Sequence, residues 1–426
     1  MTLEGESAEV VGQGVSRRRL VAGTGVGVVA GAAAGFALGH ATAAESTPAH
    51  GGDAIDLGRS YDFYTGSHQV GIETAPQRHT VFMTFDLVDG TTTQDLQVLL
   101  ARWSAAISQL MAGRSVGSVE PTRADGVPQD TGEAYDLAPA SLTVTLGLGS
   151  EFFAERFGLA DKKPKLLADL PALPSDQLRP ELTGGALSLQ ACSDDPQVAY
   201  HAIRDLARMA RGTTTTRWTV LGFGRASAGK GQTTPRNLMG YKDGTRNVST
   251  PQDYTDHVWI GAEDGEVDWM VGGSYQVVRK IRMDIEIWDS ATVTVQHRTF
   301  GRNKVEGAPL TGTKEFDTPN FTETKDGKKV IDPASHIALA SHENNNGTKI
   351  LRRGYNFTDG INDLGQLDAG LLFLSYQKNP DQFVQLQKRL GSSDLLNEYI
   401  AHIGSGLFAV PPAPQRGHYI GESLFA

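Results

Sequence analysis

The sequence predicts an α+β protein built from two similar domains, each an antiparallel sheet with helices packed against it. In the first half, segments with strand and helix periodicity follow one another in the order strand, helix, strand, strand, helix, strand. The second half contains a strand of alternating apolar residues, a buried strand and a helix. At 426 residues the chain is long enough for two domains with separate cores.

The first half carries the clearest periodicity. Apolar side chains recur at steps of three and four over 96–111, which predicts one apolar helix face, and Asp95 favours the positive end of that helix. Threonines alternate with apolar residues over 142–146, which predicts a half-buried strand. The order of elements predicts a ferredoxin-like sandwich. The predicted elements are strands at 81–87, 142–146, 187–189 and 218–223, and helices at 96–111 and 196–209.

The second half gives a similar but shorter pattern. Apolar residues alternate with charged ones over 277–287, which predicts a strand, and 371–376 is a buried strand candidate. A helix is expected at 383–390, after Pro380. We place the domain boundary near 224–234. The predicted organisation is an export signal at 1–44, a linker at 45–64, a first domain at 65–224 and a second domain at 225–426.

Composition excludes some classes of function. The net charge of −10 argues against a nucleic-acid partner. Apolar content of 39% and charged content of 21% are ordinary for a soluble globular protein. Cys192 is the only cysteine, so no intrachain disulfide can form. We expect Cys192 to be a small core residue, with a thiolate metal ligand as the alternative.

The N-terminus predicts export. Arg17 and Arg18 precede a run of small apolar residues to Leu38, and 41–43 (Ala-Thr-Ala) offers a cleavage site. This pattern is typical of a twin-arginine signal, which implies the twin-arginine translocase as a partner and an extracellular, periplasmic or cell-envelope location. The alternative is an N-terminal membrane anchor, but Ala, Gly and Val make a poor spanning helix. The acidic composition and the size also suit a homodimer.

Two later stretches contain candidate functional residues. In 332–357, His336 lies between apolar flanks and Arg352 follows an apolar run. An apolar-bounded imidazole suits haem iron, and a fixed guanidinium suits a position where negative charge develops. Taken alone, a histidine on such a strand is more often a satisfied core residue. The other stretch, 237–247, contains Asp243 among glycines.

These stretches resemble one known family, the dye-decolourising peroxidases. The resemblance rests on Gly240 followed by two variable residues and Asp243-Gly244, on His336-Ile337, and on 351–355 (Leu-Arg-Arg-Gly-Tyr), in this order. It covers nearly all of the chain after the leader and looks most like the exported subgroup that includes the haem peroxidase of iron-uptake operons. The resemblance implies two ferredoxin-like domains of the dimeric α/β barrel-like superfamily, with one haem b per chain in the C-terminal domain.

The resemblance also implies an activity and three central roles. H2O2 oxidises the haem to an oxoferryl state, and dyes or other small one-electron donors reduce it. His336 is the expected axial ligand of the iron, through Nε2. Asp243 is the expected acid–base group, and we expect activity weighted toward acidic pH. Arg352 is the expected cation where the O–O bond splits. Read alone, 242–244 (Lys-Asp-Gly) also fits a tight hairpin turn.

Further haem contacts follow from the resemblance. Gly244, Thr245 and Arg246 match a haem-contacting stretch, and Arg302 matches a Gly-Arg motif. After His336 the chain departs from the family's usual Asn-Pro-Arg, because it has Ser-His-Glu at 341–343. A propionate contact at Glu343 is therefore in doubt, with His342 as a possible replacement. His342 is also the alternative axial ligand.

Three points stay open in the sequence. Asp394 or Glu398 is expected to accept a hydrogen bond from His336, with Asp394 slightly favoured. Arg353 should face away from Arg352, where it is solvated, paired with a carboxylate or in contact with a propionate. The rival function is a haem- or porphyrin-handling protein that releases iron.

Bulky dyes cannot enter a pocket sealed by Leu371 and Phe373. Surface aromatics would carry their electrons, and the candidates, most of them expected in the core, are Trp259, Trp269, Trp288, Tyr355 and Tyr376.

Overall fold

The computed structural model describes residues 55–224 and 234–426. The chain divides into two units, Met1–His50 and Gly51–Ala426, and the described residues all belong to the second. The predicted export signal at 1–44 and the first part of the predicted linker lie outside the described residues, so both stay predictions. Among the residues that are described, we find no helix with the length and apolar character needed to cross a membrane.

The first half contains the predicted elements in the predicted order. Thr92 and Asp95 cap the first helix reciprocally, each side chain accepting a hydrogen bond from the other residue's backbone N–H. Asp195 caps the second helix, which begins at Pro196. The strands pair antiparallel in the spatial order β4-β1-β3-β2. The elements are β1 (His79–Leu87), α1 (Thr93–Met111), β2 (Thr143–Leu148), β3 (Leu187–Ser193), α2 (Pro196–Met209) and β4 (Thr214–Phe223).

The second half repeats this topology. Its four long strands pair antiparallel in the order β11-β5-β10-β9, which is again fourth, first, third and second along the chain. Both halves are therefore ferredoxin-like, as predicted. The elements are α3 (Pro251–His257), β5 (Ser274–Met283), α4 (Ile285–Ser290), α5 (Val293–Phe300), β6 (Thr324–Lys325), β7 (Lys328–Lys329), α6 (His336–Ala340), β8 (Leu351–Arg352), β9 (Tyr355–Ile361), β10 (Leu367–Gln377), α7 (Asp381–Ser393) and β11 (Ile400–Val410).

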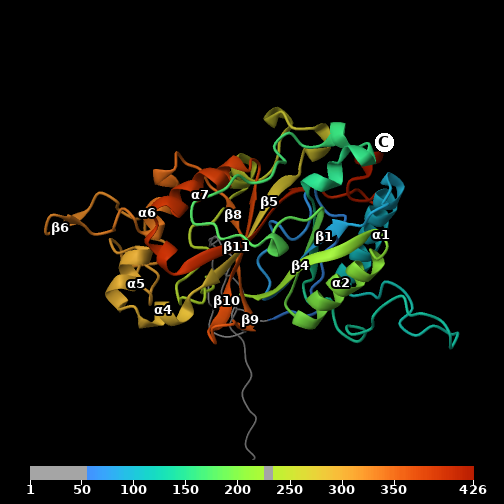
Figure 1. Cartoon of the computed structure of the whole chain (residues 1–426), viewed down its shortest axis with the longest axis horizontal. Coiled ribbons are helices and arrows are strands. Elements are labelled where there is room, and N and C mark those ends of the chain that lie inside the picture. Colours follow the sequence, from blue (N-terminus) through green and yellow to red (C-terminus); the bar gives the residue numbers. More distant parts are fainter. Residues whose placement is uncertain (1–54, 225–233) are drawn as a thin grey trace, which may run out of the picture. The chain divides into compact units, whose positions relative to one another are not determined.

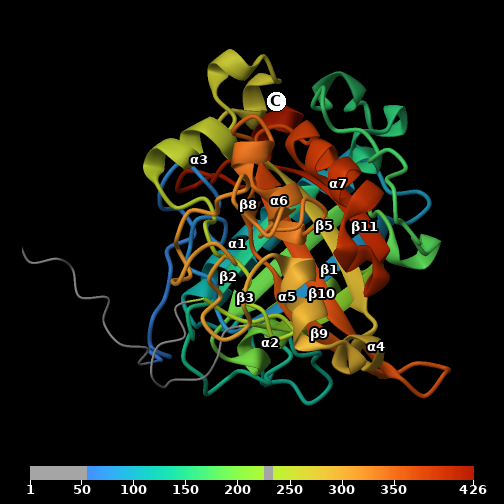
Figure 2. The same cartoon turned by 90° about the vertical axis from the view of Figure 1, so that its left-hand side faces the viewer.

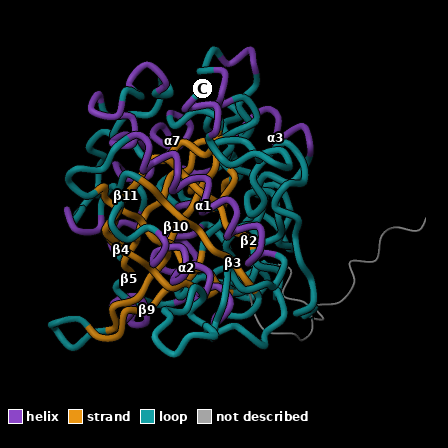
Figure 3. Tube along the Cα trace, turned by 90° about the vertical axis from the view of Figure 1, so that its right-hand side faces the viewer, coloured by secondary structure: helices purple, strands orange, loops and turns teal. Residues whose placement is uncertain are grey.

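The two sheets join into one antiparallel barrel of eight strands. Strand β4 pairs with β9 and strand β11 pairs with β2, which closes the ring, while the short β8 adds to β10. Gly222 lies at the β4–β9 junction, where a Cβ atom would meet Thr80 and Tyr355 at 2.7 and 2.8 Å. Helices α1 and α2 lie on one side and α4 to α7 on the other (Figure 1). Figure 3 shows α1 and α2 over the strands of the first half, with which they are in contact.

Barrel closure corrects one prediction. All six residues of β2 are buried, although the threonine alternation predicts a half-buried strand. One face of β2 packs against the helices and the other lies inside the barrel, so neither face meets water. Polar side chains fill much of this interior: the amide of Gln77 donates to Thr143 Oγ1 at 3.0 Å, and Thr145 Oγ1 donates to the carbonyl of Val70 at 3.1 Å.

A second correction concerns the strand predicted at 277–287. Strand β5 ends at Met283, and Ile285 begins helix α4. Ile285 and Trp288 are buried three residues apart, which is helical spacing, so the alternation that continued through Ile285 and Ile287 was misleading. The charged residues Arg279 and Lys280 of β5 are also buried. The remaining predictions, a strand at 371–376 and a helix at 383–390, are confirmed by β10 and α7.

Candidate active site

The residues predicted to bind or catalyse line one cavity in the second half of the chain. Figure 2 shows helices α5, α6 and α7 near β8 and β10, and residues from all five elements line the cavity. Apolar side chains, including Phe300, Leu371, Phe373 and Leu396, form much of its wall. The predicted residues that line it are Asp243, Gly244, Thr245, Arg246, Arg302, His336, His342, Arg352 and Asp394.

His336 is held by a buried carboxylate. It begins the short helix α6, rather than lying on a strand as its apolar flanks suggested. Its Nδ1 lies 2.7 Å from Oδ2 of Asp394, and Oδ1 of Asp394 accepts a hydrogen bond from the backbone N–H of Leu396 at 2.9 Å. Glu398, the other carboxylate that the sequence left open, is exposed. Because Nδ1 is engaged, Nε2 is the nitrogen that remains for a ligand in the cavity.

The charges around His336 favour its protonated form. Burial lowers the pKa of the imidazole, but the Asp394 carboxylate outweighs burial and leaves the pKa raised; Arg352 lowers it and Asp243 raises it further. The same carboxylate makes the neutral imidazole a stronger electron donor. The His336–Asp394 pair therefore has the properties of a metal ligand with a fixed orientation.

Asp243 and Arg352 form a second pair in the cavity. Nη1 of Arg352 lies 3.4 Å from Oδ1 of Asp243, and its Nη2 donates to the carbonyl of Thr245 at 3.0 Å. The amide side chain of Asn247 accepts from the backbone N–H of Arg352 at 2.9 Å and donates to its carbonyl at 2.8 Å. These bonds fix the guanidinium beside the carboxylate. The side chains of Asp243 and Arg352 are 27% and 30% exposed, so both can reach a small molecule in the cavity.

The loop 240–246 has an unusual backbone conformation. Gly244 has φ of +103°, which favours glycine, and Arg246 has φ of +58°. The tight hairpin that 242–244 suggested is wrong, because Lys242 forms an isolated bridge with Arg236 and the turn comes at Thr245 and Arg246. The loop thereby places the carboxylate of Asp243 in the cavity.

Positive charge gathers at the cavity beyond what nearby carboxylates neutralise. Burial lowers the pKa of Arg302 to about 10, and the neighbouring Arg246 and Arg352 lower it as well, against an opposing effect of Glu315. Nη1 of Arg302 donates to the carbonyls of Gly307 and Glu315 at 2.7 and 2.9 Å. Among the described residues, its Nε and Nη2 have no hydrogen-bond partner. This arrangement suits an anionic ligand group.

Two glutamates, Glu343 and Glu315, bind some of the residues that the sequence predicts as haem contacts. Arg246 forms an ion pair with Glu343, so Glu343 occupies one of the cations considered for the propionates. Nδ1 of His342 lies 3.5 Å from Glu343, and burial lowers the pKa of His342. The hydroxyl of Thr245 donates to Glu315 at 2.9 Å. Thr245 and Arg246 therefore line the cavity, but the Thr245 hydroxyl already donates to Glu315 and the Arg246 guanidinium is already paired with Glu343.

Sequence reasoning missed two residues of the site. Asn247 lies within the motif stretch, but nothing local shows that it holds Arg352. Glu315 binds the Lys242 ammonium at 2.5 Å and accepts from Thr245, and its sequence neighbourhood carries no recognisable signal. Both roles depend on contacts between distant parts of the chain.

The structure corrects the prediction for Arg353, confirms the one for Cys192 as a core residue, and separates the candidate aromatics by burial. Arg353 faces away from Arg352 as expected, but it is buried inside the barrel and donates to the carbonyl of Thr74 and to Gln77, so it is neither solvated nor a propionate contact. Cys192 is a buried core residue and does not line the cavity. Of the proposed surface aromatics, Trp288, Tyr355 and Tyr376 are buried, and Trp259 and Trp269 are partly exposed.

The cavity fits haem. An imidazole oriented by a buried carboxylate suits the iron, apolar walls suit the macrocycle, and guanidinium groups suit its two carboxylate arms. Asp243 and Arg352 add a proton-transferring group and a fixed cation, which haem binding alone does not require. The fold and the site together define a haem-dependent peroxidase.

The comparisons identify the family. Residues 69–224 match the model of the Dyp-type peroxidase N-terminal domain, and residues 234–415 match that of its C-terminal domain. The chain belongs to the Dyp-type peroxidase family. It is a peroxidase with haem b as its cofactor, and it uses H2O2 to oxidise small-molecule electron donors.

Named relatives and solved structures resemble the chain over most of its length. A deferrochelatase of Yersinia pestis is 37% identical over 423 residues, covering 96% of this chain and 94% of the relative. A deferrochelatase of Escherichia coli is 36% identical over 419 residues, covering 96% of each chain. DtpA from Streptomyces lividans, solved as an oxyferrous complex, is 37% identical with a TM-score of 0.81, covering 87% of this chain and 98% of that one.

Proposed function

We propose that His336 binds the haem iron through Nε2 and that Asp243 and Arg352 act on peroxide in the same cavity. The observation that carries this proposal is that one cavity contains both the His336–Asp394 pair and the Asp243–Arg352 pair. Arg302, whose Nε and Nη2 have no hydrogen-bond partner in 55–224 or 234–426, is the first candidate for a propionate contact. Arg246 and His342 are the next.

The residues divide the chemistry between them. Bound haem supplies the redox step, exchanging electrons with H2O2 and then with the donor. Asp243 takes the proton from one peroxide oxygen and gives it to the other, directly or through a water. The Arg352 guanidinium stabilises the negative charge that develops on the departing oxygen. The bond from the guanidinium to the Thr245 carbonyl and the bond of Asn247 to the Arg352 backbone hold this residue in place, so no reorganisation is needed at the moment of reaction.

Asp243→Asn tests the acid–base role. The substitution keeps the size of the side chain and removes its ability to accept a proton. We expect the rate of peroxide reaction to fall by about 100-fold or more, while haem content and the ferric absorption spectrum stay the same. Asp161→Asn, on an exposed residue of the first half, is the matched control and should react at the wild-type rate. An unchanged rate in Asp243→Asn would contradict the assignment.

The second candidate function is iron release from haem. It is favoured by one observation, the name deferrochelatase carried by relatives 36–37% identical to the chain. Incubating the purified protein with haem, without peroxide, separates the two functions. Metal-free porphyrin, recognised by its fluorescence, would support iron release; intact haem together with peroxide-dependent donor oxidation would exclude it.

We also propose that the chain is exported by the twin-arginine translocase. Arg17 and Arg18, the small apolar run behind them and the site at 41–43 support this proposal. Replacing both arginines by lysine should leave the protein and its activity inside the cytoplasm, as measured by cell fractionation. Export of the double variant at the wild-type level would contradict the proposal. A homodimer is proposed for the mature protein, and light scattering of the holoprotein tests it.

A further inference from the structure

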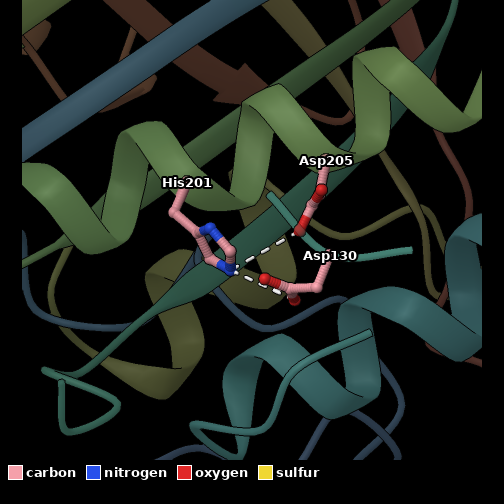
Figure 4. Close-up of side chains that lie close together, drawn as sticks. All are labelled: Asp130, His201 and Asp205. Atoms are coloured by element: carbon pink, nitrogen blue, oxygen red, sulfur yellow. Dashed lines mark ion pairs between the residues drawn. The ribbon is translucent and has the colours of Figure 1, made fainter. Parts of the chain in front are cut away.

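A buried cluster of titratable side chains lies in the first half of the chain, and none of its members lines the haem cavity (Figure 4). His201 and Asp205 stand one turn apart on helix α2, so they share one face. Asp130 comes from the connection between α1 and β2. The side chains of His201, Asp130 and Asp205 are 6%, 0% and 0% exposed. Buried carboxylates are rare unless they are paired or bind a metal.

The orientation of the imidazole leaves Nε2 facing the two aspartates. Nδ1 of His201 lies 3.3 Å from Oε2 of Glu133 and 3.4 Å from the hydroxyl of Thr131, so Nδ1 is engaged on the other side of the ring. Nε2 lies 3.6 Å from Oδ2 of Asp130 and 3.5 Å from Oδ2 of Asp205. Both distances exceed the roughly 2.7–2.9 Å of a charge-assisted hydrogen bond.

These separations match those between the ligands of a small cation. Zinc bonds of about 2.0–2.2 Å in tetrahedral geometry place neighbouring ligand atoms about 3.3–3.6 Å apart. One ligand atom from each of Asp130, His201 and Asp205 lies within 4.8 Å of the other two. The three side chains are therefore spaced for a shared ion.

One oxygen of the cluster independently points to a missing ligand. Oδ2 of Asp205 is fully buried and has no hydrogen-bond donor among the described residues, and it is directed at Nε2 of His201 (Figure 4). The other oxygen, Oδ1, accepts from the backbone N–H of Thr131 at 3.2 Å, and the Arg208 guanidinium is 4.0 Å away from it. An unpartnered buried carboxylate oxygen is costly, and a bound cation would satisfy it.

Asp130, from the connection between α1 and β2, is held in position by backbone hydrogen bonds. Oδ1 of Asp130 accepts from the backbone N–H of Gly132 at 2.8 Å, and Oδ2 accepts from that of Val116 at 2.9 Å. These bonds hold the carboxylate against α2 without any bound ion.

We propose that Asp130, His201 and Asp205 bind one divalent transition-metal cation, through Nε2 of the histidine and one oxygen of each carboxylate. Zinc is the best match, because it takes imidazole and carboxylate ligands together, whereas calcium and magnesium prefer oxygen alone. Two carboxylates and a neutral imidazole balance a divalent charge. Thr131 and Glu133 lie on the Nδ1 side of the ring, where metal-binding histidines commonly have an outer polar partner.

The burial of the site indicates a structural role. The connection 112–142 contains no helix or strand, and Asp130 is its contribution to the site. Long connections without secondary structure need other contacts to stay ordered. A bound ion would tie this connection to α2.

Metal analysis of the holoprotein tests the proposal. Protein without a histidine tag is loaded with haem, incubated with zinc chloride, desalted, and analysed for zinc and iron by mass spectrometry. We expect about one zinc per chain in addition to the haem iron, and an unfolding temperature that falls when EDTA is added. Asp205→Asn should weaken zinc binding by about 10-fold or more and lose the response to EDTA, with its haem absorption unchanged. Asp161→Asn should behave as the wild type.

The outcomes are separable even if Asp205→Asn does not fold. Calorimetric titration of zinc chloride into EDTA-treated wild-type holoprotein should then show one saturable site. The proposal is overturned if the wild type retains no zinc above background and its unfolding ignores EDTA. In that case the cluster holds a proton between the carboxylates instead of a metal.

Discussion

Replacing Asp394 by Asn should change which nitrogen of His336 is free to bind a ligand in the cavity. In the wild type, Oδ2 of Asp394 lies 2.7 Å from Nδ1 of His336 and holds the proton on that nitrogen. In the variant, the amide oxygen would keep the bond from the N–H of Leu396, which leaves the NH2 group facing Nδ1. An NH2 donor favours the tautomer of His336 that carries its proton on Nε2. A protonated Nε2 cannot bind a metal.

The expected magnitude follows from this bond. A hydrogen bond to a charged, buried partner contributes about 1.5–3 kcal/mol, and each factor of ten in affinity corresponds to about 1.4 kcal/mol. The two values give a loss of about 10- to 100-fold in haem affinity, the range found when the outer partner of a metal-binding histidine is removed. Asp394 is almost fully buried, with a side chain 3% exposed, so water cannot easily replace the lost contact.

The assay is a titration of the apoprotein with haem, followed by absorption and by transfer to a competing haem-binding protein. Glu398→Gln is the matched control, because Glu398 is a nearby carboxylate that is exposed, while the ion pair of His336 is with Asp394. It should bind haem as the wild type does. Equal haem affinity in Asp394→Asn and Glu398→Gln would refute the reasoning and the role assigned to Asp394.

Four further predictions concern pH, catalysis and stability. Because the folded-state pKa of His336 is raised, the stability it gives the apoprotein should be complete below about pH 6.5 and be lost as pH rises through the raised pKa, as urea unfolding at several pH values would show. Arg352→Leu should slow peroxide reaction by about 100- to 1,000-fold in stopped flow without loss of haem. Gly370→Ala would place a Cβ atom 1.9 Å from the carbonyl oxygen of Ile281 and should lower the free energy of unfolding by more than ~2 kcal/mol. Arg353→Met removes the donor to the buried side chain of Gln77 and to the partly buried carbonyl of Thr74, and should lower the free energy of unfolding by about 1–3 kcal/mol. Wild-type denaturation curves for Gly370→Ala or Arg353→Met would contradict the contacts assigned to that residue.

The elements of the first half could be predicted because each one carries its own periodic pattern. The capping box at Thr92 and Asp95 and the proline at 196 mark helix starts locally. The errors arose where the answer depends on distant residues. The full burial of β2 follows from barrel closure, including a pairing between Ala409 and Leu148 that no local pattern encodes. Ile285 fits both the alternation that continues strand β5 and the three-residue spacing to Trp288 of helix α4. The burial of Trp288 decides in favour of the helix.

The candidate site shows the same division. The motifs around Asp243, His336 and Arg352 identify residues that the fold brings to one cavity. The contacts that orient them could not be read from the sequence. Asn247 holds a residue 105 positions away, and Glu315 binds a residue 73 positions away. The conformation of the loop 240–246 and the burial of Arg353 likewise depend on packing against other parts of the chain.

The central claim is that His336 holds haem iron in a cavity where Asp243 and Arg352 act on peroxide. Its most direct test is the absorption spectrum of the haem-loaded protein before and after one equivalent of H2O2, beside His336→Ala. The account predicts a ferric Soret band that weakens and broadens quickly in the wild type, and loss of the normal band in the variant. A wild-type band that ignores peroxide, or a variant with the wild-type spectrum, would contradict it.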